Sequence, residues 1–534
     1  LYITNPVIFA RKALPFDSPY YYTIDENGQA VYGDRAMYLH YSQIPTPKYV
    51  QNGRSVWRNR LTINANVAEE LTPVSGLKLR AQQSVDAYDS RLKNYGFPKW
   101  PLETPMGDVY NNGVAPGTLS EGYNQQSFTR YYSFTYTHTA NYAKTFNKVH
   151  NLSLLAGEES IITRSEGFGV SSEGYRLQQM MFLGQGSTAP TVGDLSQSFG
   201  EYAMNSIFFS GDYNYDERYF ITGSYRRDGS SRFPKKHRWG DFYSVGAMWN
   251  AKNEQFLKDV TWLNNLRVSL SYGTSGNSGI GNYAYQGLIG TTSTTYNNGT
   301  IIGISQIPTE DLTWETVHAF DLAVSGRIFN QLSIDLDFYR KETKDMLMSI
   351  PWSVTTGFGS GIGNIGSMSN TGLDVNLNWD IYSSKDWYVG FRTNLNYNHN
   401  EITELFQGRD AYTLSNTGTR YEVGHNAGEF YMVRFAGVDP RDGRQMWYTK
   451  EGNLTKVYNE ERDAVMTGKS QYAPISGGFG LQARWKGLSV SADFAWAADK
   501  YMINNDRYFI ENSNFGTDFN QMTSMLDVWT TPGQ

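Results

Sequence analysis

Cysteine is absent from this chain, and so is any long run of apolar residues. Without cysteine there can be no disulfide, no cysteine-ligated zinc and no thiol nucleophile. A helix that crosses a bilayer needs about 20 predominantly apolar residues, and no stretch of the 534 residues comes near that. A membrane role would therefore have to be carried by β-strands.

A strongly basic charge and a metal-binding motif are also missing. The net charge is −6, which argues against a nucleic-acid partner. The 7 histidines are scattered and form no HExxH motif, so the sequence shows no zinc signature. No linker or low-complexity tract divides the chain. We expect residues 1–534 to be an internal part of a longer protein, because the chain starts without Met and ends in a polar, turn-like stretch.

Aromatic side chains are plentiful instead. They make up 15% of the residues, with 39 Tyr, although the mean hydropathy is only −0.51. Many rings in a hydrophilic chain are typical of a transmembrane β-barrel, which has an apolar outer face, a polar lumen and aromatic girdles at both membrane interfaces.

Apolar and polar residues alternate along the chain with a period of two. Apolar residues occupy every second position from Leu373 to Ile381, with Asp or Asn between them. After a turn at Ser383–Asp386, a similar alternation runs from Trp387 to Tyr397. Each run has about ten residues, which suits a membrane strand and is long for a globular one.

The same unit of strand, tight turn and strand recurs about seven times. The predicted hairpins lie near 54–90, 127–164, 203–228, 238–275, 312–346, 364–403 and 476–500. The pattern therefore predicts an all-β fold with roughly fourteen strands. Weaker candidates near 281–290 and 425–437 would raise the number to sixteen.

The connections between strands differ in length in a regular way. Within hairpins they mostly have two to five residues, whereas between hairpins we expect long ones at 91–126, 165–202, 276–311 and 404–475. Two exceptions are a short helix predicted on the turn side at 251–264 and a modest connection at 229–237. Short periplasmic turns and long extracellular loops are typical of bacterial outer-membrane barrels. A soluble sandwich or propeller also alternates, but it rarely shows this asymmetry, and no blade repeat is visible.

Three short patterns imitate functional sites. Gly361–Gly366 matches a GxGxxG fingerprint, but an alternating strand follows it where nucleotide binding needs a helix N-terminus. Asp335 and Asp337 share one strand face, where a polar lumen lining explains them better than a catalytic carboxylate pair does. The stretch Asp439–Gly443 lacks the EF-hand spacing and predicts a turn. We therefore expect no catalytic residue, cofactor or metal, and no enzyme.

Aromatic residues in the predicted loops are the ligand-contact candidates. Trp100, Trp352 and Phe358 lie in predicted extracellular loops. Flat rings stack on sugar faces or on apolar peptide side chains, and offer a large contact area at low entropy cost. The alternative is that they pack the loops themselves or contact a partner protein.

From Tyr215 onward, a series of sequence blocks resembles one family. Tyr215–Tyr219 (YDERY), Arg226–Phe233 (RRDGSSRF) and Ser244–Trp249 (SVGAMW) resemble the most characteristic stretch of the SusC/RagA family of TonB-dependent outer-membrane transporters of Bacteroidetes. Further blocks follow in the family order at Leu266–Asn277, Leu312–Thr316, Asn364–Asp374, Phe435–Gly443, Gly477–Phe479 and Trp529–Gly533. Tyr243 departs from the pattern, which has proline after Phe242, and this puts a local turn in doubt.

The resemblance implies a 22-stranded barrel in the outer membrane. Its lumen would hold an N-terminal plug that, with the first and last strands, lies outside this sequence. It also implies TonB-dependent import of a nutrient, an oligosaccharide (glycan) or alternatively a peptide. The implied partners are TonB and a SusD-like lipoprotein that caps the extracellular mouth. A passive porin and a secreted β-rich enzyme or adhesin remain as alternatives.

Overall fold

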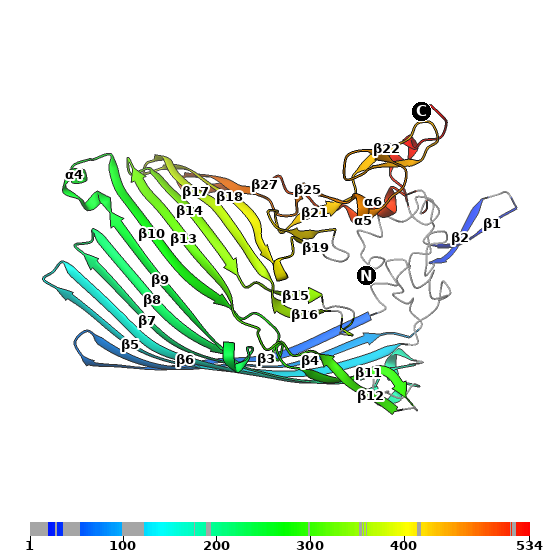
Figure 1. Cartoon of the computed structure of the whole chain (residues 1–534), viewed down its shortest axis with the longest axis horizontal. Coiled ribbons are helices and arrows are strands. Elements are labelled where there is room, and N and C mark those ends of the chain that lie inside the picture. The colour runs from blue at the N-terminus through cyan, green and yellow to red at the C-terminus, as the bar shows by residue number, and fades with distance from the viewer. Residues whose placement is uncertain are drawn as a thin grey trace.

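One antiparallel sheet of fourteen strands dominates the computed structural model (Figure 1). The structure describes residues 20–26, 29–35, 54–98, 122–175, 177–187, 194–296, 299–351, 355, 357–358, 360–413, 418–512, 514 and 520–533. The strands of the sheet are β3 (Arg54–Val74), β4 (Leu77–Gly96), β5 (Tyr123–Phe146), β6 (His150–Glu173), β7 (Leu195–Tyr215), β8 (Tyr219–Ser230), β9 (Trp239–Asn250), β10 (Leu263–Asn277), β13 (Glu315–Ile328), β14 (Leu332–Lys344), β17 (Gly366–Ser383), β18 (Trp387–Leu405), β26 (Ile475–Trp485) and β27 (Leu488–Ala498).

Every strand of the sheet pairs with the sheet strands that precede and follow it, so the sheet is a meander without crossovers. All seven predicted hairpins and the number of fourteen strands are confirmed. Three of the tight turns are centred on Asn147–Lys148, Asp216–Glu217 and Phe329–Asn330, and both central residues have positive φ. This is the type I′ geometry, whose twist matches that of the paired strands.

Helices among the described residues are few and short. The predicted helix on the turn side is α4 (Gln255–Lys258), between β9 and β10. The others are α5 (Glu460–Asp463), α6 (Asn505–Ile510) and single 3₁₀ turns. No helix in this part of the chain is long and apolar enough to cross a membrane.

Short turns and long connections lie at opposite ends of the sheet (Figure 1). Strands β3 to β7 have 20 to 24 residues, about twice what a membrane strand needs. Three of the four predicted long connections are consequently shorter than predicted, at 97–122, 174–194 and 406–474, whereas the fourth, at 278–314, keeps about the predicted length. The prediction ended the strands too early because apolar alternation stops at the membrane border, whereas backbone pairing continues into water.

The weaker strand candidates were wrong as wall strands. The first overlaps the start of β11 (Leu288–Tyr296), which pairs with β12 (Gly299–Gln306) in a separate small sheet. The second covers β21 (Glu429–Met432) and β22 (Phe435–Val438), which pair with β25 (Val465–Ser470) and β23 (Gln445–Tyr448). These strands fold within the long connections, so the described wall has fourteen strands and not sixteen.

The register separates an apolar face from a polar face. One row aligns Leu336 with Val375, and Val375 with Leu395. The next row, on the other face, places Asp374 opposite Asn396, which donates a side-chain hydrogen bond to it. Because strand side chains alternate between faces, this split runs through the sheet as predicted.

Asp335 and Asp337, whose spacing resembles that of a catalytic carboxylate pair, lie on the polar face. Asp335 lies opposite Asn376 and Asp337 lies opposite Asp374, so both line the wall as expected. Tyr243, where a local turn was in doubt, lies within β9 and not in a turn. Its N–H donates to Thr274 Oγ1 at 3.0 Å.

Aromatic rings gather near the short-turn end of the outer face. Trp387 stacks on Trp485 across β18 and β26, with ring centroids 5.7 Å apart. Trp262 lies against Phe329 at 6.2 Å, beside the turn between β13 and β14. Such rings are typical of the membrane–water interface, where an apolar body and a polar edge are both accommodated.

One ion pair on the polar face reaches across an intervening strand. Arg392 on β18, Gly480 on β26 and Asp493 on β27 lie in one register row. Arg392 Nη2 lies 2.7 Å from Asp493 Oδ1. A Cβ at Gly480 would collide with both side chains, so the glycine leaves the space in which they meet.

The two edge strands of the sheet have 21 residues (β3) and 11 residues (β27). In the part of the chain that the structure describes, β3 pairs only with β4 and β27 pairs only with β26. The backbone groups on the outer side of each edge strand therefore have no strand partner there. In hydrocarbon such groups must be hydrogen-bonded within the protein.

A charge should be tolerated very differently on neighbouring positions of β17. Val375→Arg puts a guanidinium on the apolar face, and it should cost roughly 2–4 kcal/mol of folding free energy if the site lies near the membrane midplane. Asn376→Arg, on the polar face, should cost much less. Urea titration of the full-length receptor in lipid vesicles measures both, and equal costs would show that the two faces are misassigned.

The long connections should be extracellular and the tight turns periplasmic. Trypsin added to intact cells should cleave within 406–474, unless a partner shields it, and spare the turns at Lys385 and Lys486. Residues 1–534 contain no cysteine. A single cysteine introduced by Lys385→Cys or by Arg409→Cys can therefore be tested for surface exposure with a membrane-impermeant maleimide. Labelling of the first and not of the second on intact cells would reverse the topology.

Candidate functional site

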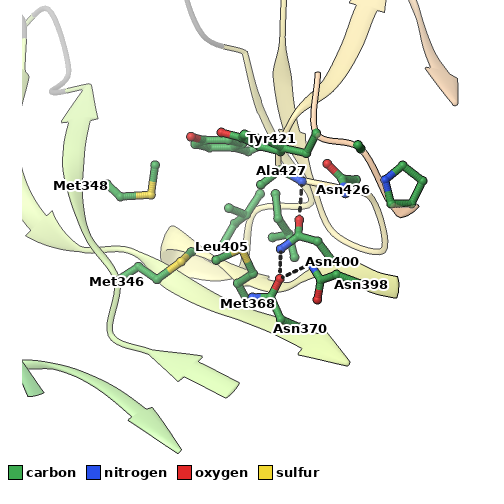
Figure 2. A pocket seen from close by; sticks show the side chains of 14 residues that line it. Met346, Met348, Met368, Asn370, Asn398, Asn400, Leu405, Tyr421, Asn426 and Ala427 are labelled. Carbon is green, nitrogen blue, oxygen red and sulfur yellow. Dashed lines mark hydrogen bonds between the residues drawn. The ribbon is translucent and has the colours of Figure 1, made fainter. Parts of the chain in front are cut away.

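A pocket of ≈ 460 Å³ lies where the polar face of β17 and β18 meets the long connections (Figure 2). Three stretches of chain build it: the ends of these two strands, the start of the connection 345–365, and the connection 406–474. The lining residues are Met346, Met348, Met368, Asn370, Asn398, Asn400, Ile402, Leu405, Tyr421, Asn426, Ala427, Tyr472, Ala473 and Pro474.

Asparagine side chains form a hydrogen-bonded ladder on the wall of the pocket. Asn398 and Asn400 are two residues apart on β18 and therefore share its polar face. Their Nδ2 atoms donate to Asn370 Oδ1 of β17 at 3.1 and 2.9 Å. Asn400 Oδ1 in turn accepts from the backbone N–H of Ala427 at 2.9 Å, and Asn398 Oδ1 accepts from the Tyr339 hydroxyl at 3.1 Å.

The lining beside the ladder is apolar and deformable. Met346, Met348 and Met368 form it together with Ile402 and Leu405. Methionine is unbranched and polarizable, so it adapts to partners of different shape. No charged side chain is among the described lining residues. The pocket therefore suits a neutral group that is partly apolar.

The roof of the pocket is the segment Tyr421–Ala427, and it is fixed to the wall. Ile402 N–H donates to His425 O at 2.9 Å, and Gly424 N–H donates to Ile402 O at 2.8 Å. The Tyr421 hydroxyl of the roof is neutral at physiological pH, since the usual tyrosine pKa lies near 10 and burial raises the pKa of Tyr421 further.

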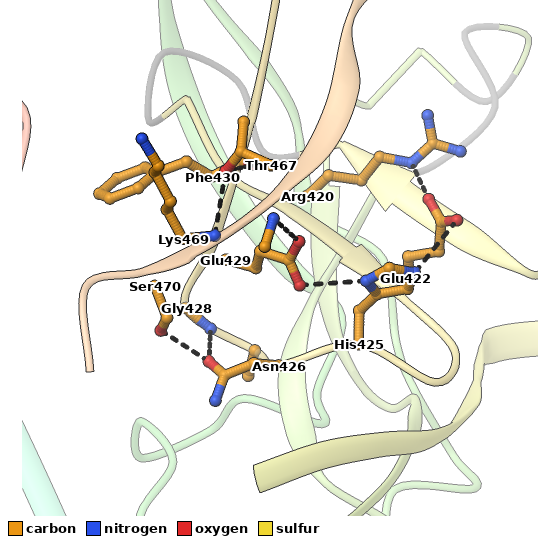
Figure 3. A network of polar contacts seen from close by, with 12 residues as sticks. Arg420, Glu422, His425, Asn426, Gly428, Glu429, Phe430, Thr467, Lys469 and Ser470 are labelled. Atoms are coloured by element: carbon orange, nitrogen blue, oxygen red, sulfur yellow. Dashed lines mark hydrogen bonds and ion pairs between the residues drawn. The ribbon is translucent and has the colours of Figure 1, made fainter. Parts of the chain in front are cut away.

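A buried carboxylate anchors the roof segment (Figure 3). Glu429 is only 6% exposed; its Oε2 lies 3.0 Å from His425 Nδ1 and its Oε1 accepts the backbone N–H of Gly468. His425 Nε2 also lies 3.9 Å from Glu422 Oε1. The roof is thus tied to β25, which makes the pocket a preformed feature.

The predicted turn at Asp439–Gly443 lies in a small lobe beside the pocket region. It joins β22 to β23, and the Asp439 carboxylate is buried against Arg441 Nη2 at 3.0 Å and Lys456 Nζ at 2.6 Å. The hydrogen bonds from Arg441 and then Lys456 hold the pKa of Asp439 well below its usual range. Trp529 packs on Gly443 and donates to the carbonyl of Pro440 at 3.0 Å. Two blocks that carry the family resemblance therefore contact each other.

The glycine fingerprint and the loop aromatics can be placed only in part. Gly361–Gly366 runs from β16 (Ser360–Asn364) into β17, so a strand follows it, as expected. Phe358 is half-buried just before β16 and is not among the residues that line the pocket. Trp100 and Trp352 lie outside the described residues. The contact of these three residues with a ligand stays a prediction.

The pocket itself was not predicted. Its asparagines were visible in the alternation of β18, but they look like any other lumen-facing residue there. The roof residues lie more than twenty positions further along the chain. Among the described residues, no group of three or more histidine or acidic side chains is placed to hold a metal ion.

An antiparallel meander with one apolar face, one polar face and aromatic rings near its short-turn end defines the wall of an outer-membrane β-barrel. One family of such barrels matches the chain. The family model described as "TonB dependent receptor-like, beta-barrel" matches residues 9–517, and the chain belongs to this family.

Named relatives are of the SusC/RagA type. TonB-dependent receptor P26 of Formosa agariphila is 25% identical over 94% of the chain and 52% of the relative. TonB-dependent receptor SusC of Bacteroides thetaiotaomicron is 27% identical over 86% of the chain and 49% of the relative. The solved structure of the RagAB peptide transporter matches 94% of the chain and 56% of its own, with 35% identity and a TM-score of 0.83. The chain thus spans about half the length of these proteins.

Removing the Glu429 carboxylate should loosen the roof of the pocket. Glu429→Ala leaves the Gly468 N–H without its acceptor, which costs about 1–3 kcal/mol. Glu429→Gln keeps an acceptor oxygen and should cost less. Hydrogen exchange measured by mass spectrometry over 421–432 and 465–470 should speed up most in the alanine variant. The matched control is Glu422→Gln, which leaves Glu429 in place; unchanged exchange in Glu429→Ala would contradict the assigned role.

Proposed function

We propose that the protein containing this chain imports a nutrient across the outer membrane by a TonB-dependent mechanism. The observation that supports this most is the polar inner face of a receptor-family wall, with a preformed neutral pocket at its long-connection end. A wall of this kind provides a conduit and a binding surface. Membership of a receptor family, in which transport needs no covalent step, supports the expectation that the chain is not an enzyme.

For the substrate we favour a peptide. The RagAB peptide transporter is 35% identical to the chain over 94% of its length. The methionines of the pocket also suit apolar side chains better than sugar rings. An oligosaccharide, which was the first expectation from the sequence, remains the second candidate. Tyr421 and Tyr472 line the pocket and could offer ring faces for sugar stacking.

The proposed partners follow from the resemblance to SusC/RagA proteins. A plug in the lumen would block diffusion, so a ligand bound above it could not pass without a force on the plug. TonB would supply that force, and a SusD-like lipoprotein would cover the mouth. The loop aromatics Trp100, Trp352 and Phe358 are proposed as further ligand contacts from the long connections.

Uptake of the cognate nutrient should collapse in cells that lack a functional TonB system. Binding of the nutrient at the cell surface should persist, because binding needs no movement of the plug. Radiolabelled uptake and surface retention, measured in parallel in both strains, separate the two steps. If uptake continued unchanged without TonB, the pore would be passive and the porin alternative would replace this proposal.

A further inference from the structure

The direction of each hydrogen bond in the asparagine ladder is fixed by the backbone. A backbone N–H can only donate, so the atom of Asn400 that faces Ala427 N is its oxygen. Asn400 must then donate through Nδ2, and the atom that receives this bond is the oxygen of Asn370. The same oxygen receives Asn398 Nδ2, which leaves the oxygen of Asn398 to accept from the hydroxyl of Tyr339.

The asparagine of the roof is oriented in the same way. Asn426 Oδ1 accepts from the backbone N–H of Gly428 at 2.8 Å and from Ser470 Oγ at 2.8 Å. Its amide nitrogen therefore points its two N–H groups away from those partners. Figure 2 shows this side chain at the roof, above the ladder on the wall.

The ladder consequently has its amide oxygens engaged and donors left over. Within the described residues, both N–H groups of Asn370 and of Asn426 have no partner, and Asn398 and Asn400 each retain one N–H. The lining side chains that could still accept a bond are mainly the hydroxyls of Tyr421 and Tyr472. The pocket therefore presents an excess of neutral donors beside an apolar wall.

We propose that this pocket binds acyl oxygens, the main-chain carbonyl or terminal carboxylate of a peptide, with an adjacent apolar side chain against the methionines. This rests on the proposed import function and specifies its substrate. An acyl oxygen only accepts hydrogen bonds, so it matches the donors that are left over. A sugar hydroxyl brings its own proton, and a buried donor that finds no acceptor costs about 1–3 kcal/mol.

Because methionines line the pocket, we expect it to accept apolar side chains of different shapes and to reject charged ones. Met346, Met348 and Met368 can repack around Leu, Met or Phe side chains. A Lys or Asp side chain placed against the methionines would meet neither a ladder N–H nor a counter-charge among the described lining residues, so its desolvation would not be compensated. Binding should therefore depend on acyl oxygens at the ladder and on a neutral side chain against the methionines, and little on which apolar residue that is.

Asn370→Asp tests the proposal because the change is nearly isosteric. An aspartate oxygen still accepts from Asn398 and Asn400, so the ladder is kept, while a carboxylate oxygen replaces the free NH₂ group. The probe is an N-terminally fluorescein-labelled pentapeptide with a central Leu between alanines, binding to the full-length receptor in detergent. Its affinity should fall by at least about tenfold. The matched control is Asn376→Asp, on the same strand and face but outside the pocket, which should bind as the parent does.

Two further arms identify the ligand chemistry. The same peptide with a C-terminal amide separates the two acyl sources: equal affinity assigns the main-chain carbonyl, and weaker binding assigns the carboxylate. Maltoheptaose as competitor tests the oligosaccharide alternative. Unchanged peptide binding in Asn370→Asp, or displacement of the peptide by maltoheptaose, would overturn this inference. Binding requires no TonB, so either result is distinct from a failure of TonB-dependent uptake.

Discussion

The hydrogen-bonding demand of the backbone is the constraint on which this structure depends. In hydrocarbon no water is present to hydrogen-bond the backbone N–H and C=O groups, so each strand must find its hydrogen-bond partners in the neighbouring strands. The meander of β3 to β27 does this for every strand except the outer sides of its two edges. Those edges can lie in a membrane only when further strands close the sheet. The same closure creates an inside and an outside, and so requires the apolar and polar faces.

The hydrophobic constraint ends at the membrane surface, but the sheet does not. Strands of 20 to 24 residues continue above the bilayer, where their outward side chains pair by charge, as Arg130 does with Asp89 at 2.9 Å. The connections are attached to this raised wall. The pocket forms at such a junction, since wall asparagines are met there by a roof that is pinned to β18 and β25. The raised wall thus forms one side of the pocket.

Features that depend on residues close together in the sequence could be predicted from it, and features that depend on distant residues could not. The alternation from Leu373 to Ile381 is local, so it predicted strand, turn and facing correctly, and the family blocks added the barrel. The upper ends of β4 to β7 were missed because charged and polar residues, such as Arg91 and Glu166, interrupt the outward apolar alternation there. The ladder at Asn370, Asn398 and Asn400 was missed for another reason. The direction of its hydrogen bonds is set by the backbone N–H of Ala427, which reaches Asn400 only through tertiary folding that no local pattern encodes.

The ion pair between Arg392 and Asp493, which meets above Gly480, has a mechanical consequence. If a plug in the lumen were pulled, part of the load would pass into the wall as shear between neighbouring strands. Hydrogen bonds between two strands resist sliding of that pair only. A side-chain link that skips a strand couples β18 to β27, so that these two strands cannot shift relative to each other by a residue pair unless the ion pair opens. The space that Gly480 leaves on the polar face is thus a place where the wall is stiffened across its strands.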